Sequence, residues 1–173
     1  MKKNKITIVV GMIVLIIGFI YMLGPDDTTK YVQGQETEYI NFCFETGQET
    51  PTTILRTIND VKARGLDNLR INLDPANLLL YGKGNPMDAV DVFGQYVVSM
   101  HVKDGDYPTD GNNLGCEYKV GTGRVNFDYI LRKLRTFNYQ GPLTIEREIS
   151  GEQQNKDIID TIQYLQNILK TID

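Results

Sequence analysis

The chain has 173 residues, enough for one domain with a hydrophobic core, and its 41% apolar and 23% charged content is typical of a globular protein. The formal net charge is -4; Lys2, Lys3 and Lys5 are the only charged residues among the first 23, so the remainder carries 15 basic residues against 22 acidic ones. No basic run occurs there, which argues against a nucleic-acid partner. Cys43 and Cys116 are too few for a disulfide scaffold or a cysteine zinc site, although they could pair.

The N-terminal segment differs from the rest of the chain. Residues 6–23 form an uncharged stretch of 18 residues that follows three lysines, and at about 1.5 Å per residue a helix of this length would nearly span a bilayer. The pattern predicts an uncleaved single-pass membrane anchor over residues 1–23, with the N-terminus cytoplasmic and the domain outside. Secretion after signal cleavage is the alternative, but the apolar run is long for a signal and no A-x-A site follows it. Residues 24–37 are predicted to be a linker and residues 38–173 the domain.

From residue 38, strand and helix patterns alternate along the chain. The predicted strands cover residues 39–45, 69–74, 97–103 and 143–146. The predicted helices follow each strand and cover residues 51–64, 86–93, 127–137 and 155–171. About twenty residues after the third strand form a loop that is too long to be a simple connector. Four consecutive strand–helix units predict an α/β fold with a parallel sheet and right-handed crossovers.

Chemically useful side chains stand at the ends of all four predicted strands. Glu45, Asp74 and Glu146 end three of them, and the remaining strand carries His101, the only histidine. Acids at strand ends, or a buried histidine that bonds a carbonyl, are common without function. The joint pattern nevertheless predicts a metal site, because the carboxyl ends of parallel strands meet at one face. Three oxygen donors and one imidazole suit a divalent ion, and we expect Mn²⁺ or Mg²⁺ rather than Co²⁺ or Zn²⁺.

Such a site has the equipment for isomerisation or epimerisation of a sugar. A metal bound to a hydroxyl and a carbonyl acidifies the adjacent carbon, and Glu45 and Glu146, on the first and last strands, are the natural pair for moving the proton. Lys103 shares a strand face with the histidine and could stabilise an oxyanion, or could simply pair with Asp104 or another carboxylate. Glu148 has the same strand parity as Glu146 and is expected to lie behind it.

Five segments carry a resemblance to a known family, and they are FETGQET (44–50), NLDPANLLLYGKGNP (72–86), MHVKDGD (100–106), VGTGRVNFDYIL (120–131) and YQGPLTIERE (139–148). They resemble the sugar phosphate isomerase/epimerase family, the xylose isomerase-like TIM-barrel group that includes tagatose/psicose 3-epimerases, inosose dehydratase and endonuclease IV. The resemblance covers residues 38–170 approximately. It implies metal ligation by Glu45, Asp74, His101 and Glu146, proton transfer by the two glutamates, and a small carbohydrate substrate, phosphorylated or not. The Gly121-x-Gly123 turn resembles the family's GxG, which alone is only a tight turn.

Several departures from the family pattern qualify this expectation. Asn77 stands where many relatives have a second histidine, so it could contact a substrate hydroxyl but not act as a base. A single histidine argues against the endonuclease IV branch. The family barrel has eight strands in about 250 residues, whereas only its last four are expected here, as a half-barrel with two exposed edge strands and an open apolar interior.

The half-barrel leaves three interpretations open. A second copy of the chain, or a separate N-terminal half-barrel, would complete the barrel and yield an enzyme. Alternatively, the chain is a truncated, inactive fragment. In the third interpretation it is a membrane-tethered module, anchored through residues 6–23, that binds a metal or a sugar without turning it over.

Overall fold

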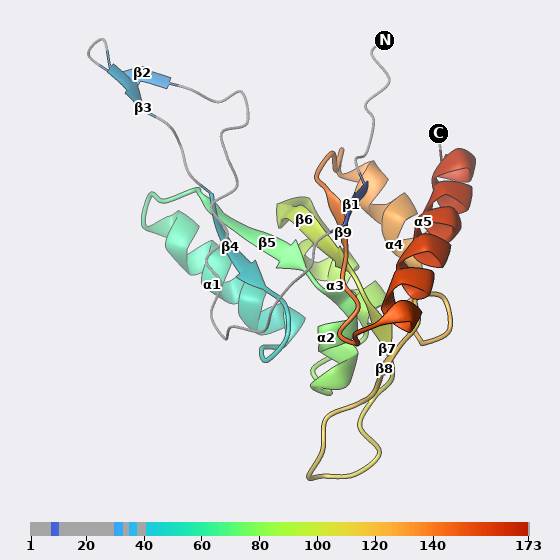
Figure 1. Cartoon of the computed structure of the whole chain (residues 1–173). Coiled ribbons are helices and arrows are strands. Elements are labelled where there is room, and N and C mark those ends of the chain that lie inside the picture. Colours follow the sequence, from blue (N-terminus) through green and yellow to red (C-terminus); the bar gives the residue numbers. More distant parts are fainter. Residues whose placement is uncertain (1–7, 11–29, 33–34, 38–40, 173) are drawn as a thin grey trace.

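A five-stranded parallel sheet is the centre of the structure, a computed structural model that describes residues 8–10, 30–32, 35–37 and 41–172. The strands lie in the order β1-β9-β6-β5-β4, and every neighbouring pair is parallel (Figure 1). Their bounds are Ile8–Val10 for β1, Phe42–Glu45 for β4, Leu69–Leu73 for β5, Val97–Val102 for β6 and Leu143–Ile145 for β9. The predicted α/β fold with a parallel sheet of βα units is therefore confirmed.

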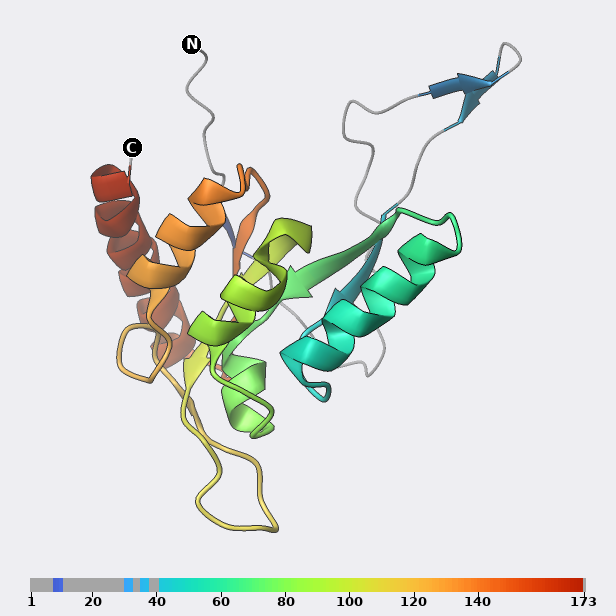
Figure 2. The ribbon, with the colours of Figure 1, turned by 180° about the vertical axis from the view of Figure 1, so that it is seen from behind.

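Four helices cover one face of this sheet, as the view from behind shows (Figure 2). They are α1 (Pro51–Ala63), α3 (Pro86–Phe93), α4 (Phe127–Thr136) and α5 (Glu152–Ile172). In chain order each helix packs against the next. The sequence defines where three of them begin, because the side chains of Thr50, Asn85 and Asn126 each accept a backbone N–H from the first turn.

The two faces of the sheet differ in polarity. Large apolar side chains such as Ile71, Met100 and Ile145 point toward the helices and are fully buried. Since successive side chains of a strand alternate between faces, the opposite face carries the residues between them, which are mostly polar: Glu45, Asn72, Asp74, Ser99, His101, Thr144 and Glu146. The expected apolar interior is therefore wrong, because the apolar residues of these strands are used against the helices.

The N-terminal prediction falls mainly outside the described residues. Of the predicted anchor over residues 1–23, the structure describes only β1, which lies parallel to β9 with Ile8 opposite Leu143, where a helix was predicted. Three apolar, β-branched residues suit a strand, and β9 offers unpaired backbone groups. Within the described ranges, no helix is both long and apolar enough to cross a membrane. The predicted linker over residues 24–37 contains a short antiparallel pair, β2 (Lys30–Val32) with β3 (Gln35–Thr37).

Two short elements lie at the carboxyl ends of the strands, where Figure 1 shows them below the sheet. The helix α2 (Pro75–Leu80) follows β5 directly and was not predicted. The long loop after β6 folds back on itself through β7 (Asp104–Gly105) and β8 (Glu117–Tyr118), which pair antiparallel. A 3₁₀ turn at Gly94–Tyr96 leads into β6. Both cysteines are free, Cys43 buried in the sheet and Cys116 exposed in the loop.

Candidate metal centre

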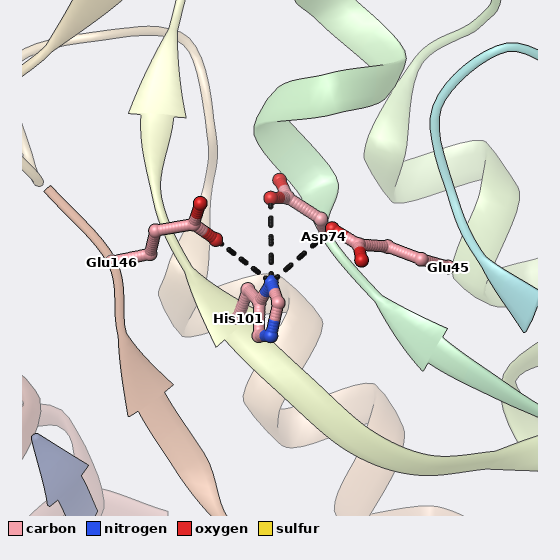
Figure 3. Close-up of side chains that lie close together, drawn as sticks. All are labelled: Glu45, Asp74, His101 and Glu146. Carbon is pink, nitrogen blue, oxygen red and sulfur yellow. Dashed lines mark ion pairs between the residues drawn. The ribbon is translucent and has the colours of Figure 1, made fainter. Parts of the chain in front are cut away.

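Four side chains converge at the carboxyl end of the sheet (Figure 3). The Nδ1 atom of His101 lies 2.8 Å from Oε2 of Glu146, 3.4 Å from Oε1 of Glu45 and 3.7 Å from Oδ2 of Asp74. One ligand atom from each of the four residues lies within 4.8 Å of all the others. The structure thus brings together the four residues that the strand-end pattern predicted.

Asp74 serves two purposes in this arrangement. Its Oδ1 atom accepts the backbone N–H of Asn77 at 2.9 Å and so caps α2, which leaves Oδ2 directed at the cluster. Thr46, in the turn after β4, fixes the backbone of Asp74 from the other side: its hydroxyl donates to the Asp74 carbonyl at 2.6 Å and accepts the Asp74 N–H at 2.8 Å. These bonds join the ends of β4 and β5, from which two of the four ligand candidates come.

Burial and mutual charge strongly perturb the groups in the cluster. Burial raises the pKa of Asp74, although the hydrogen bond with His101 and the charge of Lys103 work against it. Burial alone would lower the pKa of His101, but the carboxylates of Asp74, Glu146 and Glu45 outweigh it and raise that pKa to about 12. Burial would likewise raise the pKa of Glu146, but His101 and Lys103 bring it down to about 2. The carboxylates therefore favour a positive charge at their centre, which the protonated imidazole of His101 supplies in this structure.

A divalent cation fits this requirement. The Asp74 Oδ2 and Glu146 Oε2 atoms are buried and accept no hydrogen bond of good geometry from the described residues, although both face His101. Buried carboxylate oxygens without such bonds are costly unless they are paired or bind a metal. Three carboxylate oxygens and one imidazole nitrogen around one point make a donor set for a hard or borderline divalent ion.

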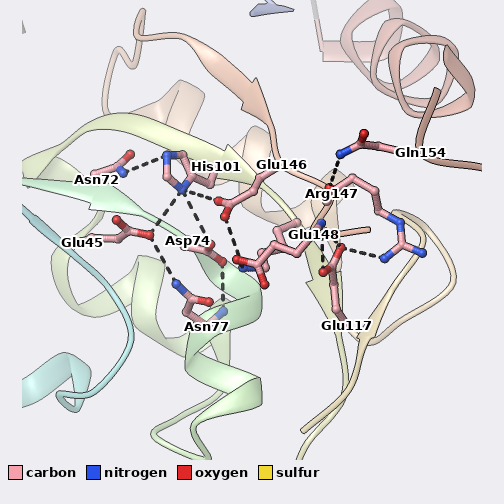
Figure 4. Close-up of polar contacts among 11 residues, drawn as sticks. Glu45, Asn72, Asp74, Asn77, His101, Glu117, Glu146, Arg147, Glu148 and Gln154 are labelled. Carbon is pink, nitrogen blue, oxygen red and sulfur yellow. Dashed lines mark hydrogen bonds and ion pairs between the residues drawn. The ribbon is translucent and has the colours of Figure 1, made fainter. Parts of the chain in front are cut away.

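The three predicted substrate-binding residues contact this cluster, and Figure 4 shows two of them, Asn77 and Glu148, beside it. Lys103 is almost completely buried, and its Nζ atom lies 2.8 Å from Glu148 Oε1 and 3.4 Å from Glu146 Oε1. Burial tends to lower the pKa of Lys103, but the charges of Asp74 and Glu146 raise it overall. The Asn77 side chain donates to Glu45 Oε1 at 3.4 Å. Lys103 therefore pairs with the glutamates and not with Asp104.

Asp104 has a structural role that the sequence analysis missed. Its buried carboxylate accepts four backbone N–H groups: those of Gly105 and Val125 at Oδ1, and those of Gly121 and Gly123 at Oδ2, at 2.8 to 3.0 Å. A Cβ atom on Gly123 would lie 2.3 Å from Oδ1, so only glycine permits this approach. The N–H groups of Gly121 and Gly123 in the GxG turn therefore donate to an aspartate of the chain itself. The signal in the sequence was an acid directly after a buried strand.

A second network holds the segment that follows β9. Arg147 donates to Asp157 on α5 at 2.8 Å and to Glu117 on β8 at 2.7 Å, and Glu117 also accepts the backbone N–H of Glu148. This network fixes the backbone on the C-terminal side of Glu146. Its members are 30 and 10 residues apart in sequence, so no local pattern could have revealed it.

The fold and the cluster together define a parallel βα protein with a carboxylate–imidazole site at the carboxyl ends of its strands. The family profile described as xylose isomerase-like TIM barrel matches residues 32–168. The chain therefore belongs to the xylose isomerase-like TIM barrel family.

Relatives with known structures agree with this assignment. A xylose isomerase domain protein from Planctomyces limnophilus is 40% identical, with a TM-score of 0.70 over 80% of this chain and 48% of that one. A xylose isomerase-like TIM barrel protein from Mycobacterium smegmatis, solved in complex with magnesium, is 20% identical, with a TM-score of 0.60 over 77% of this chain and 45% of that one. A D-tagatose 3-epimerase-like protein is 22% identical, with a TM-score of 0.58 over 77% and 48% of the two chains.

Among curated proteins, an uncharacterised protein of Methanocaldococcus jannaschii is 27% identical over 122 residues, which are 68% of this chain and 37% of that protein. The chain thus spans about half, or less, of the length of the relatives it matches.

Proposed function

We propose that this chain provides the metal centre and the proton-transfer residues of a divalent metal-dependent sugar isomerase or epimerase. The observation that carries the proposal is the cluster itself, in which Glu45 and Glu146 approach the centre from opposite sides (Figure 3). Membership of the xylose isomerase-like family, and likeness in fold to a D-tagatose 3-epimerase-like protein, support this class of reaction.

The residues present allow specific roles to be assigned. A divalent cation held by Glu45, Asp74, His101 and Glu146 would polarise the carbonyl and hydroxyl of a sugar and acidify the C–H between them. The carboxylate of Glu146 borders this centre and would accept that proton. Glu45 is 36% exposed at its side chain and can return a proton on the other face. The buried ammonium of Lys103, beside Glu146, would stabilise an oxyanion that develops there.

The surroundings of the site favour a sugar without a phosphate group. Among the described residues near the cluster, Lys103 is paired with Glu148, Arg147 with Glu117, and Arg124 with Asp106. The N–H groups of the GxG turn, which could otherwise hold a phosphate, are bonded to Asp104. A phosphate bound on this side would have to displace carboxylates that are already paired.

We further propose that additional βα units complete the barrel beside β4, which is one of the two outer strands of the described sheet, with β1 at the other edge. A second copy of the chain and a separate N-terminal half-barrel are the two sources. Light scattering on the purified chain distinguishes them, because self-completion predicts twice the mass of the 19.6 kDa chain and dependence on another protein predicts the single mass.

The function is tested with Glu146→Gln. We expect Mn²⁺-dependent exchange of a ketose C–H with solvent tritium to disappear, because the variant lacks the base, while calorimetry still detects weakened Mn²⁺ binding. Glu152→Gln is the matched control, because it removes the same charge at the exposed start of α5. This variant should exchange normally. Unchanged exchange in Glu146→Gln would refute the assigned role. Mn²⁺ binding without exchange by the wild-type chain, in either assembly state, would instead favour a metal- or sugar-binding module.

A further inference from the structure

Asn72 is a buried polar residue for which the proposed reaction has no use. It lies on β5, two residues before Asp74 and on the same face of the sheet, with only 2% of its surface exposed. Its side-chain amide lies 3.1 Å from the Nε2 atom of His101 (Figure 4). It thus contacts the imidazole nitrogen that points away from the three carboxylates.

The two nitrogens of His101 have different requirements. Nδ1 faces Glu146, Glu45 and Asp74, so it is the atom that could bind a cation. A neutral imidazole carries one proton, and Nδ1 has a free lone pair only if that proton is on Nε2. A buried Nε2–H in turn requires an acceptor. Metal binding through Nδ1 therefore depends on what faces Nε2.

The Asn72 amide can present either its oxygen or its nitrogen to Nε2. In the structure Nδ2 faces the ring, and Oδ1 has no hydrogen-bond partner among the described residues. No described contact at Oδ1 therefore opposes a half-turn of the amide, whose two ends are nearly equal in shape. With the nitrogen facing Nε2 the ring must carry its proton on Nδ1, where it would block a cation. With the oxygen facing Nε2, the amide accepts Nε2–H and Nδ1 is left open.

We propose that Asn72 is a positioning residue that accepts the Nε2–H of His101 through its amide oxygen and thereby reserves Nδ1 for the metal ion. The inference rests on the metal centre of the proposed function. Partners on the far nitrogen of a metal-binding histidine fix its tautomer and orientation and change metal affinity about 10- to 100-fold. On this view β5 supplies both a ligand, Asp74, and the residue that prepares the ligand on the neighbouring strand.

The chain is well suited to a direct test, because His101 is its only histidine. Labelling the full-length protein with ¹⁵N-histidine gives one imidazole with two ring nitrogens, and their shifts and couplings show which one carries the proton. Zn²⁺ is the probe, because it is diamagnetic and calorimetry measures its affinity in the same buffer. In the wild-type protein loaded with Zn²⁺ we expect the proton on Nε2 and the metal-induced shift on Nδ1.

Two variants separate positioning from simple packing. Asn72→Leu removes the acceptor with little change of volume, and it should weaken Zn²⁺ binding about tenfold or more and leave the bound Zn²⁺ divided between Nδ1 and Nε2. Asn72→Asp can only accept a hydrogen bond, so it should keep the Nε2–H tautomer and bind Zn²⁺ at least as tightly as wild type. A packing role predicts the opposite for the aspartate, since it adds a buried charge. Ser99→Ala, on the same face and opposite Asn72 in the β5–β6 register, is the control and should change neither reading.

The outcomes are distinguishable from failure of the proposed function. Wild-type protein that does not bind Zn²⁺ at His101 removes the metal centre and this inference with it. Zn²⁺ bound at Nε2, or an Asn72→Leu protein with unchanged affinity and tautomer, overturns the role of Asn72 and leaves the metal centre intact. If circular dichroism shows that Asn72→Leu is unfolded, the test rests on Asn72→Asp. Loss of the Nε2–H tautomer in a folded Asn72→Asp protein also overturns the proposal.

Discussion

Replacing Asp104 by asparagine should destabilise the protein far more than its position at the start of a loop suggests. Two backbone N–H groups bond to each carboxylate oxygen, and asparagine replaces one oxygen by an NH₂ group that faces two of these donors. Hydrogen bonds to a charged acceptor contribute about 1.5–3 kcal/mol each. Loss of two predicts a decrease of about 3–6 kcal/mol in the free energy of unfolding, and the 121–125 turn should loosen.

The assay is urea unfolding of the wild type, Asp104→Asn and Asp110→Asn, followed by circular dichroism. Asp110 is a matched control, because it also accepts two backbone N–H groups, from Asn112 and Asn113, but in an exposed loop. Replacing Asp110 should lower the free energy of unfolding by about 0.5 kcal/mol or less. If the free energy of unfolding of Asp104→Asn lies within about 1 kcal/mol of the wild-type value at an unchanged m-value, the carboxylate does not hold the turn and the reasoning is refuted.

Three further predictions use the charges and exposures at the site. Because the pKa of His101 is raised to about 12, a cation that binds at Nδ1 must displace a proton. The affinity for the cation should therefore rise about tenfold per pH unit near pH 7. Calorimetry in two buffers of different ionisation enthalpy should detect the release of about one proton. The pKa of Glu146 is lowered to about 2 in the fold, so its contribution to stability is present above its usual pKa and is lost as pH falls toward 2; acid titration of Glu146→Gln, if equally steep, contradicts this. A thiol reagent should modify Cys116 in the native protein and Cys43 only after unfolding, because Cys43 is buried; mass spectrometry after limited labelling identifies the site.

Periodicity and capping signals predicted the main elements closely. The helix over residues 51–64 appears as α1, Pro51–Ala63, because its apolar residues follow a helical spacing, and the threonine that caps it is Thr50. By contrast, α2 was missed although Asp74-Pro75 is a strong start signal. Its six residues, nearly all buried, are too short to show a helical stripe. The apolar N-terminal run illustrates the reverse problem, because Ile8–Val10 fits a membrane helix and a buried strand equally well by composition.

The candidate site was predictable to the extent that it follows from topology. Parallel strands end at one face, so residues at four strand ends had to meet, and the histidine was unique. The surrounding contacts were not predictable, because they depend on how segments distant in sequence fold onto these ends. Asp104 meets the 121–125 turn and Arg147 meets α5 only in three dimensions. The role of Asn72 was not predictable either, because it depends on the contact with His101 on the neighbouring strand, which the local sequence does not show.

The location of Glu45 on β4, an outer strand of the described sheet, links cation binding to strand pairing. Of the four ligand candidates, three come from β5, β6 and β9, which have neighbours on both sides, whereas Glu45 comes from a strand that has one neighbour among the described residues. A segment that pairs with β4 would order this ligand. By thermodynamic reciprocity, the factor by which such pairing strengthens cation binding equals the factor by which the cation strengthens pairing. Divalent ion concentration would then control assembly of the barrel as well as its chemistry.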